Sequence, residues 1–452
     1  MTSSQSADTG DIGGAVGTSA STSTSTSTSD DQHRPGTRHT QRTRHTLSPA
    51  LAMSGAAVAF ASLYLAAGSL TPFLVLFERQ WGFPPAMLSL AFAVYAVGFL
   101  VAVLVFGSLS DHIGRRPVLI AALIVQLASN VLFLIGPDVG WVVAGRIVQG
   151  VSSGAATAAF TAALVELAPP HLKRLGAILG SVSLTGGLAA GSLLAGIAIQ
   201  LTAAARGITF IALILLTVIG GIAMVFAPET IGRRPGALRS LIPTLRIPPD
   251  ARAEFAAAAP AVAAVWMLAG LSGGISPSLV RSVFHLDSGL LNGLAGFVAP
   301  AVSAIIGLAF ARVDSRRAMS IGIGSAIVGS LGIIGGVLAG SLTIMIVGQA
   351  LAGVGFGAAF TAALRLIVPL ARPHERAGTV AAIYVVSYLA FGLPIIIEGQ
   401  LVGAIGTIPA VVAYTALTLV LSLASLIAQT ALRRRSRRGE HSRRRPHVPT
   451  RP

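Results

Sequence analysis

A positively charged side chain stands inside one of the longest apolar stretches of the chain. Arg146 lies three residues before Gln149 in the apolar residues 140–167. Residues three apart share one face of a helix, so both side chains are predicted to point the same way. A charge inside an apolar span is costly and by default functional, and Arg146 would stabilise the negative charge of an acid nearby. The other interpretation is that Arg146 extends to the water interface, about six residues away.

The acids are absent from the middle of every long apolar stretch. Glu78 and Glu398 lie near the outer ends of two stretches, and Glu166 lies near the inner end of a third. A coupling group must gain and lose a proton as its surroundings change. We therefore expect Glu398, or secondarily Glu78, to carry a proton, with Arg146 as its modulator. The other interpretation is that both carboxylates simply lie at the water interface.

A short loop concentrates glycine and charge. It contains Gly107, Asp111, Gly114, Arg115 and Arg116 within ten residues. Gly107 allows helices to approach, and Gly114 permits a tight turn. The Asp111 carboxylate can bind a helix N-terminus or an Arg. The simpler interpretation is that these charges only orient the helices.

The chain lacks the residues and motifs that several kinds of enzyme, metal and cofactor chemistry require. The chain has no Cys, which excludes thiol catalysis, disulfides and Cys-based metal sites. It has no phosphate-binding Walker loop, no HExxH and no glycine-rich dinucleotide turn. The sequence therefore predicts no enzyme, no metal site and no cofactor.

The composition indicates what positions these residues. Of 452 residues, 53% are hydrophobic and only 11% charged, against about a quarter charged in soluble proteins. Apolar runs of about 20 residues can each cross a bilayer as a helix. The predicted fold is an all-α membrane protein with twelve transmembrane helices. They are expected near 51–77, 87–109, 117–136, 140–167, 175–200, 207–227, 255–280, 289–311, 318–339, 342–368, 377–402 and 407–431.

The positive charge of the chain, +16 in total, is distributed unevenly. With a cytoplasmic N-terminus, 27 Lys and Arg fall on the cytoplasmic side and 3 on the opposite side. Basic loops face the cytoplasm, so both termini are predicted there, in a multi-pass protein of the cell membrane. The charge lies in loops and a tail without aromatic residues between, which favours an anionic membrane surface over nucleic acid.

The chain divides into two similar halves. The sequence AAFTAAL occurs at residues 158–164 and again at 358–364. A proline-rich connection at 228–254 separates six predicted spans from six. We therefore predict a disordered cytoplasmic N-terminal tail at 1–48, six-helix bundles at 49–227 and 255–432, and a basic tail at 433–452.

The glycine and charge pattern of residues 107–116 resembles the signature loop of the major facilitator superfamily, G-x-L-x-D-x-x-G-R-R/K. The resemblance covers about residues 50–432 and implies two six-helix bundles around one cavity, with this loop in gating. Arg146, Gln149 and Gly150 are similar to the family's R-x-x-Q/G-G pattern. Residues 185–191 resemble an element of its drug–proton antiporters, although Gly187 replaces the usual Pro and Ala190 the usual Gly.

The resemblance also implies partners for the loop. Arg115 or Arg116 is expected to pair with Glu166, and Asp111 to dock near Gly378 at the start of span 11, both closing the cytoplasmic side in the outward-facing state. A second, degenerate copy of the loop keeps an acid and an Arg pair, at Asp314, Arg316 and Arg317.

Polar or aromatic residues near the middle of spans are candidates for the cavity lining. An aromatic, weakly charged cavity suits amphipathic or apolar organic solutes. The candidates are Tyr64, Tyr95, Gln126, Trp266, Asn292, Tyr384 and Tyr388.

These patterns favour a secondary active transporter, monomeric and proton-coupled, that exports small lipophilic or amphipathic compounds. Uptake or facilitated transport of a neutral metabolite is the main alternative, and a membrane sensor without transport is a third. The expected partners are a small-molecule substrate, the proton and the lipid bilayer.

Overall fold

The structure is a computed structural model that describes residues 47–443, with side chains described for residues 47–434. The predicted N-terminal tail, 1–48, falls almost entirely outside the described residues. The same is true of the last nine residues of the predicted basic tail.

Twelve helical segments of the described residues are long and apolar enough to cross a membrane, so the predicted all-α fold is confirmed. The first half contributes α1 (Pro49–Trp81), α2 (Pro85–Phe106), α4 (Arg115–Ile135), α5 (Val139–Leu167), α6 (Lys173–Leu201) and α7 (Ala205–Phe226). The second contributes α9 (Pro249–Gly270) with the π-helix η2 (Leu271–Ile275) and α10 (Ser276–Ser282), then α11 (Gly289–Ala309), α12 (Ser315–Leu338), α13 (Leu342–Ile367), α14 (Arg376–Ile405) and α15 (Thr407–Arg443).

Two turns are marked by single glycines. Gly340 lies between α12 and α13 with φ of 63°, and Gly406 alone separates α14 from α15 with φ of 86°. Glycine adopts positive φ without the steric cost that a Cβ brings. These residues therefore end helices that carry few polar residues at the join.

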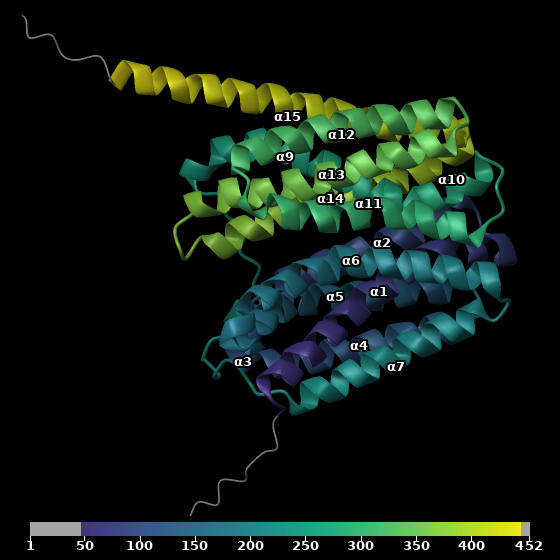
Figure 1. Ribbon diagram of the computed structural model, residues 1–452, viewed down its shortest axis with the longest axis horizontal. Coiled ribbons are helices and arrows are strands. Elements are labelled where there is room, and N and C mark those ends of the chain that lie inside the picture. Colours follow the sequence, from purple (N-terminus) through teal and green to yellow (C-terminus); the bar gives the residue numbers. More distant parts are fainter. Residues whose placement is uncertain (1–46, 444–452) are drawn as a thin grey trace, which may run out of the picture. The chain divides into compact units, whose positions relative to one another are not determined.

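The helices form two groups that follow the order of the chain, α1–α7 and α9–α15 (Figure 1). Within the first group α2 packs on α5 and α1 on α6, and within the second α13 packs on α11 and α12. The groups meet along two helix pairs, α2 with α14 and α6 with α11. The repeated AAFTAAL segments lie in α5 and α13, which belong to different groups.

The two ends of the bundle differ in how the groups are joined. We call the end carrying loop 107–117 and residues 312–317 the basic end, and the opposite one the far end. At the far end Arg79 pairs with Asp287 at 2.7 Å, and Ser192 donates to the carbonyl of Gly293. At the basic end the connection between the halves reaches both groups, since its Ser240 carbonyl accepts from Ser108 and its Arg246 pairs with Glu375.

Two helices extend well into segments predicted as the connection and the basic tail. α9 begins at Pro249, within the connection predicted for 228–254, and Pro249 occupies the first helical turn, where proline costs no hydrogen bond. α15 runs to Arg443, so the helix continues into the basic segment predicted as a tail.

Candidate functional site

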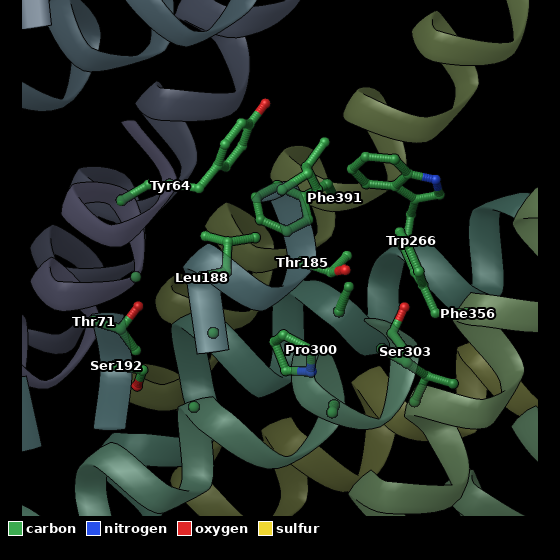
Figure 2. Close-up of a pocket in the computed structure, with 18 of the residues that line it drawn as sticks. Tyr64, Thr71, Thr185, Leu188, Ser192, Trp266, Pro300, Ser303, Phe356 and Phe391 are labelled. Atoms are coloured by element: carbon green, nitrogen blue, oxygen red, sulfur yellow. The ribbon is translucent and has the colours of Figure 1, made fainter. Parts of the chain in front are cut away.

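A cavity of about 100 Å³ lies where the two halves meet. Both groups of helices contribute to its wall, with α1, α2, α5 and α6 on one side and α9, α11, α13 and α14 on the other. Figure 2 shows Tyr64, Phe391 and Trp266 around it, with Leu188 and Thr185 between the halves. Its aromatic residues are Tyr64, Phe92, Tyr95, Trp266, Phe356, Tyr388 and Phe391.

Arg146 is the charged residue of this wall. Its side chain is buried, with 2% of the residue exposed, so it does not extend to the membrane interface. Nε donates to the Ala91 carbonyl at 3.2 Å, and Nη1 donates to Gln149 Oε1 at 2.9 Å. The guanidinium also lies 4.6 Å from the ring centre of Tyr95 and 5.3 Å from that of Phe92, in cation–π contact.

Glycines in α5 place Arg146 against α2. A Cβ on Gly150 would lie 2.4 Å from the Tyr95 carbonyl oxygen, and one on Gly154 would lie 2.4 Å from that of Phe99. Any larger residue would therefore force the helices apart. The close approach brings the Arg146 side chain over the α2 rings.

The second half contributes an aromatic wall around Trp266. The Trp266 ring centre lies 4.8 Å from that of Tyr388, 5.2 Å from that of Phe356 and 5.9 Å from that of Phe391. Tyr388 also stacks on Phe99 of the first half at 4.2 Å. Such rings bury large apolar area and hold their positions through mutual packing.

A π-helical turn separates this cavity from a second one at the far end. Gly273 lines the central cavity and Gly274 the far-end cavity, and a Cβ on Gly274 would lie 2.8 Å from the Phe92 ring. Phe92 in turn packs on Phe391 across the halves, with ring centres 5.2 Å apart. π-turns of this kind occur frequently at functional sites. Phe92 and Phe391 line the central cavity and are not part of the far-end wall. Sequence reasoning missed both, although the pair Gly273–Gly274 was a visible signal.

The far-end cavity, about 590 Å³, contains the two carboxylates considered for proton coupling. Glu78 and Glu398 both line it, together with Arg79 and Arg281. Glu398 is 4% exposed, and no described residue forms a hydrogen bond or ion pair with its carboxylate. Arg146 lies in the wall of the other cavity, so the structure does not bring the expected modulator into contact with either Glu.

The loop at the basic end forms a charged cluster. Arg115 contacts the Glu166 carboxylate at 3.3 Å and also pairs with Asp111. Asp111 does not reach Gly378, because Thr244 and Arg246 of the connection occupy that position. Arg115 and Glu166 belong to α4 and α5, so the pair joins helices of one half rather than the two halves.

Comparison with known proteins decides the family. The model of the Major Facilitator Superfamily matches residues 56–393, most of the chain. The chain belongs to the major facilitator superfamily. Two solved superfamily-like structures share the fold: the human organic anion transporter MFSD10 (TM-score 0.60, 16% identity, 83% of this chain and 99% of that one) and a peptide transporter POT (TM-score 0.68, 13% identity, 84% and 94%).

Curated relatives match over shorter segments. The inner membrane transport protein YajR of Escherichia coli is 35% identical over 86 residues, 19% of this chain and 18% of YajR. The quinolone resistance protein NorA of Staphylococcus aureus is 23% identical over 111 residues, 25% of this chain and 29% of NorA. The matches span less than a third of each relative, so they support a superfamily transporter in general.

In this superfamily member an acid outside the expected loop completes the basic-end cluster. Glu229, just after α7, accepts from the backbone N–H of Arg115 at 2.8 Å and of Arg116 at 3.1 Å. It thereby satisfies free N–H groups at the start of α4. Gly114 precedes that start with φ of 102°, as a tight turn requires. Glu229 lies more than a hundred residues away in sequence, and nothing local indicated it.

The second copy of the superfamily loop uses its charges differently. Asp314 accepts from the backbone N–H of Arg317 at 2.9 Å and so caps α12. Arg316 pairs at 2.9 Å with Glu254, which is buried in α9. The acid of this copy therefore stabilises a helix end, whereas Asp111 pairs with an Arg.

The remaining candidates are dispersed. Gln126 donates to Asn130 at 3.0 Å inside the first half, and neither Gln126 nor Asn292 is in the wall of the central cavity. Tyr384, Gly107 and Asp111 line a third cavity, of about 330 Å³, at the basic end. Within the described residues no group of three His, Cys, Asp or Glu is arranged to hold a metal ion.

Proposed function

We propose that this transporter exports small lipophilic or amphipathic organic compounds by alternating access. The observation that carries the proposal is the aromatic cavity between the two halves, which the π-turn at Gly273 and Gly274 separates from a second cavity at the far end. A ring-lined cavity of low polarity binds apolar surface that water disfavours. Movement of one half against the other would expose it to each side in turn.

The halves are in contact at both ends, directly at the far end and through the connection 228–254 at the basic end. Arg79–Asp287, Ser192–Gly293 and Gln200–Ser288 all hold the far end together. Each end also has a cavity, of about 590 Å³ at the far end and of about 330 Å³ between α2 and α14 at the basic end. Opening the far end would break the far-end contacts and separate Phe92 from Phe391.

We place the protein in the cell membrane as a monomer, with both termini and the connection 228–254 in the cytoplasm. The basic residues concentrate at that end. Because the chain has no Cys, a Ser240→Cys variant carries a single label site. An impermeant thiol reagent should label it only after the cells are opened. Labelling in intact cells would show that the connection lies outside the cell and that the predicted topology is wrong.

Proton coupling is assigned to Glu398, and secondarily to Glu78. Glu398 is buried, lines the far-end cavity and lacks a described hydrogen-bond partner, so its surroundings would change when that end opens. Any effect of Arg146 on the protonation of Glu398 would act from the central cavity to the far-end cavity, across Phe92. Glu398→Gln should remove the pH dependence of export; if Glu398→Gln and Glu78→Gln both keep the normal pH profile, neither carries the proton.

Flux of a fluorescent dye in proteoliposomes, with and without an imposed pH gradient, tests the function. Flux that accelerates with the gradient supports proton-coupled export. Flux of a neutral metabolite that ignores the gradient would favour facilitated transport, which the absence of a mid-span acid among residues 51–431 also suits. Absence of any flux would point to a sensor.

A further inference from the structure

The central cavity has an unbalanced charge. Among the residues that line it, Arg146 is the one ionic side chain, and no carboxylate is present. The far-end cavity, by contrast, contains both signs, with Glu78 and Glu398 beside Arg79 and Arg281. A buried cation without a counter-ion is costly, so its persistence calls for a partner.

The protein itself supplies only neutral partners to Arg146. Two of them are hydrogen-bond acceptors, the Ala91 carbonyl and Gln149 Oε1, and two are the rings of Tyr95 and Phe92. No described residue accepts a hydrogen bond from Nη2 or forms an ion pair with Arg146. The guanidinium therefore retains donors for an anion, in the planar arrangement that suits a carboxylate or sulfonate.

Aromatic rings surround the place where such an anion would bind. Trp266 is 7% exposed, and its Nε1–H has no hydrogen-bond partner among the described residues. Tyr388, Phe356 and Phe391 pack around Trp266 and line the same cavity. A flat ring fits between such faces, and an organic cation would be repelled by Arg146.

We propose that the central cavity binds organic monoanions with an aromatic body, whose carboxylate or sulfonate pairs with Arg146. The inference rests on the proposed function, because it names the substrate class of the same cavity. It narrows that function from lipophilic compounds in general to negatively charged ones.

The test compares three aromatic probes of similar size and different charge: benzoate, benzamide and benzylammonium. Binding to the purified full-length protein is measured by calorimetry, without any gradient. Benzoate should bind about tenfold more tightly than benzamide, because charged hydrogen bonds are stronger than neutral ones. Benzylammonium should bind most weakly.

Single-residue variants test whether Arg146 causes the preference for benzoate over benzamide. Arg146→Gln should bring benzoate to the level of benzamide, and Arg146→Lys, which keeps the charge, should retain part of the preference. Arg206→Gln is the matched control, since Arg206 lies over the Phe77 ring at 5.2 Å and donates to the Phe133 carbonyl, outside the cavity wall. It should leave the preference unchanged. Folding of each variant is checked by its thermal unfolding.

Three results would overturn the inference: equal binding of benzoate and benzamide, tighter binding of benzylammonium, or no binding of benzoate up to its solubility. A preference that survives in Arg146→Gln would also overturn it, and if that variant fails to fold, an undiminished preference in Arg146→Lys does so, because Lys lacks the planar fork of donors. Failure of the proposed function is distinguishable, because benzoate would then bind but show no flux in proteoliposomes.

Discussion

Helices α5 and α13 contain the same seven residues at 158–164 and 358–364, yet they equip the two halves differently. Gln149 and Gln349 both lie nine residues before the repeat, and both are fully buried. Gln149 accepts from Arg146, whereas Gln349 donates to Ser276, next to the π-turn, at 2.7 Å. Where α5 has Arg146, α13 has Ile346. One scaffold thus supplies a charge in the first half and an uncharged network behind an aromatic wall in the second.

The largest expected effect concerns the glycine contacts of these two helices. Gly154→Val in α5 and Gly353→Val in α13 should each lower stability by about 1–3 kcal/mol, because each Cβ would lie within 2.5 Å of a carbonyl oxygen of the neighbouring helix. Thermal unfolding of purified protein measures this. Gly221→Val, where a Cβ meets nothing within 4 Å, is the control. A large loss in only one half would show that the two helices are not packed alike.

The second prediction separates the contribution of the Arg146 charge to probe binding from the contribution of the aromatic wall. Trp266→Leu removes the ring that contacts Tyr388, Phe356 and Phe391. It should weaken benzoate and benzamide alike, by about tenfold, because ring packing does not depend on the probe's charge. Calorimetric titration of the variant gives the dissociation constants of benzoate and benzamide. Should Trp266→Leu instead weaken only benzoate, the division of roles between the halves would be wrong.

A smaller effect is expected at the network beside the π-turn. Gln349→Leu leaves the Ser276 and Ser272 hydroxyls without the amide and should cost about 1–2 kcal/mol in unfolding free energy. Adding Ser276→Ala should recover part of that loss, because the unpaired hydroxyl is removed with its partner. A double variant as unstable as the single one would mean that the hydrogen bond contributes little.

The smallest effect on stability is expected at the two loops of the basic end. Asp111→Asn weakens a half-exposed ion pair with Arg115, which costs at most about 1 kcal/mol, and should reduce turnover while leaving the amount of protein near normal. Asp314→Asn changes a helix cap instead and should leave turnover unchanged. Flux and membrane abundance are measured together. Normal flux in Asp111→Asn would restrict that loop to setting topology.

The sequence predicted the twelve spans because a bilayer fixes how many apolar residues a helix needs. It could not predict which face of each span looks into the cavity. In a membrane protein the lipid-facing surface and the interior are both apolar, so polarity does not separate them. Gln126 and Asn292 were expected in the wall and lie outside it, and Phe92 and Phe391 were overlooked because they are ordinary apolar residues.

Charged residues were easier to predict than their partners. Arg146 was conspicuous because it interrupts an apolar run, and its bond to Gln149 follows from helical spacing. Glu229 was missed because its partners at the start of α4 come from a distant part of the chain. The position expected for Asp111 near Gly378 is taken by the connection between the halves, whose path no local pattern specifies.

The lone charge of Arg146 has a consequence for the membrane potential. In the proposed cycle an empty cavity takes one positive charge from the potential of one side to that of the other, worth about 2.3 kcal/mol per 100 mV if the whole field falls across it. A potential that is negative inside then favours the empty cavity open to the cytoplasm, ready to load. A bound monoanion cancels the charge of Arg146, so the change of the loaded protein to the outward-facing state does not depend on the membrane potential. The potential then acts on the return of the empty protein to the state that is open to the cytoplasm.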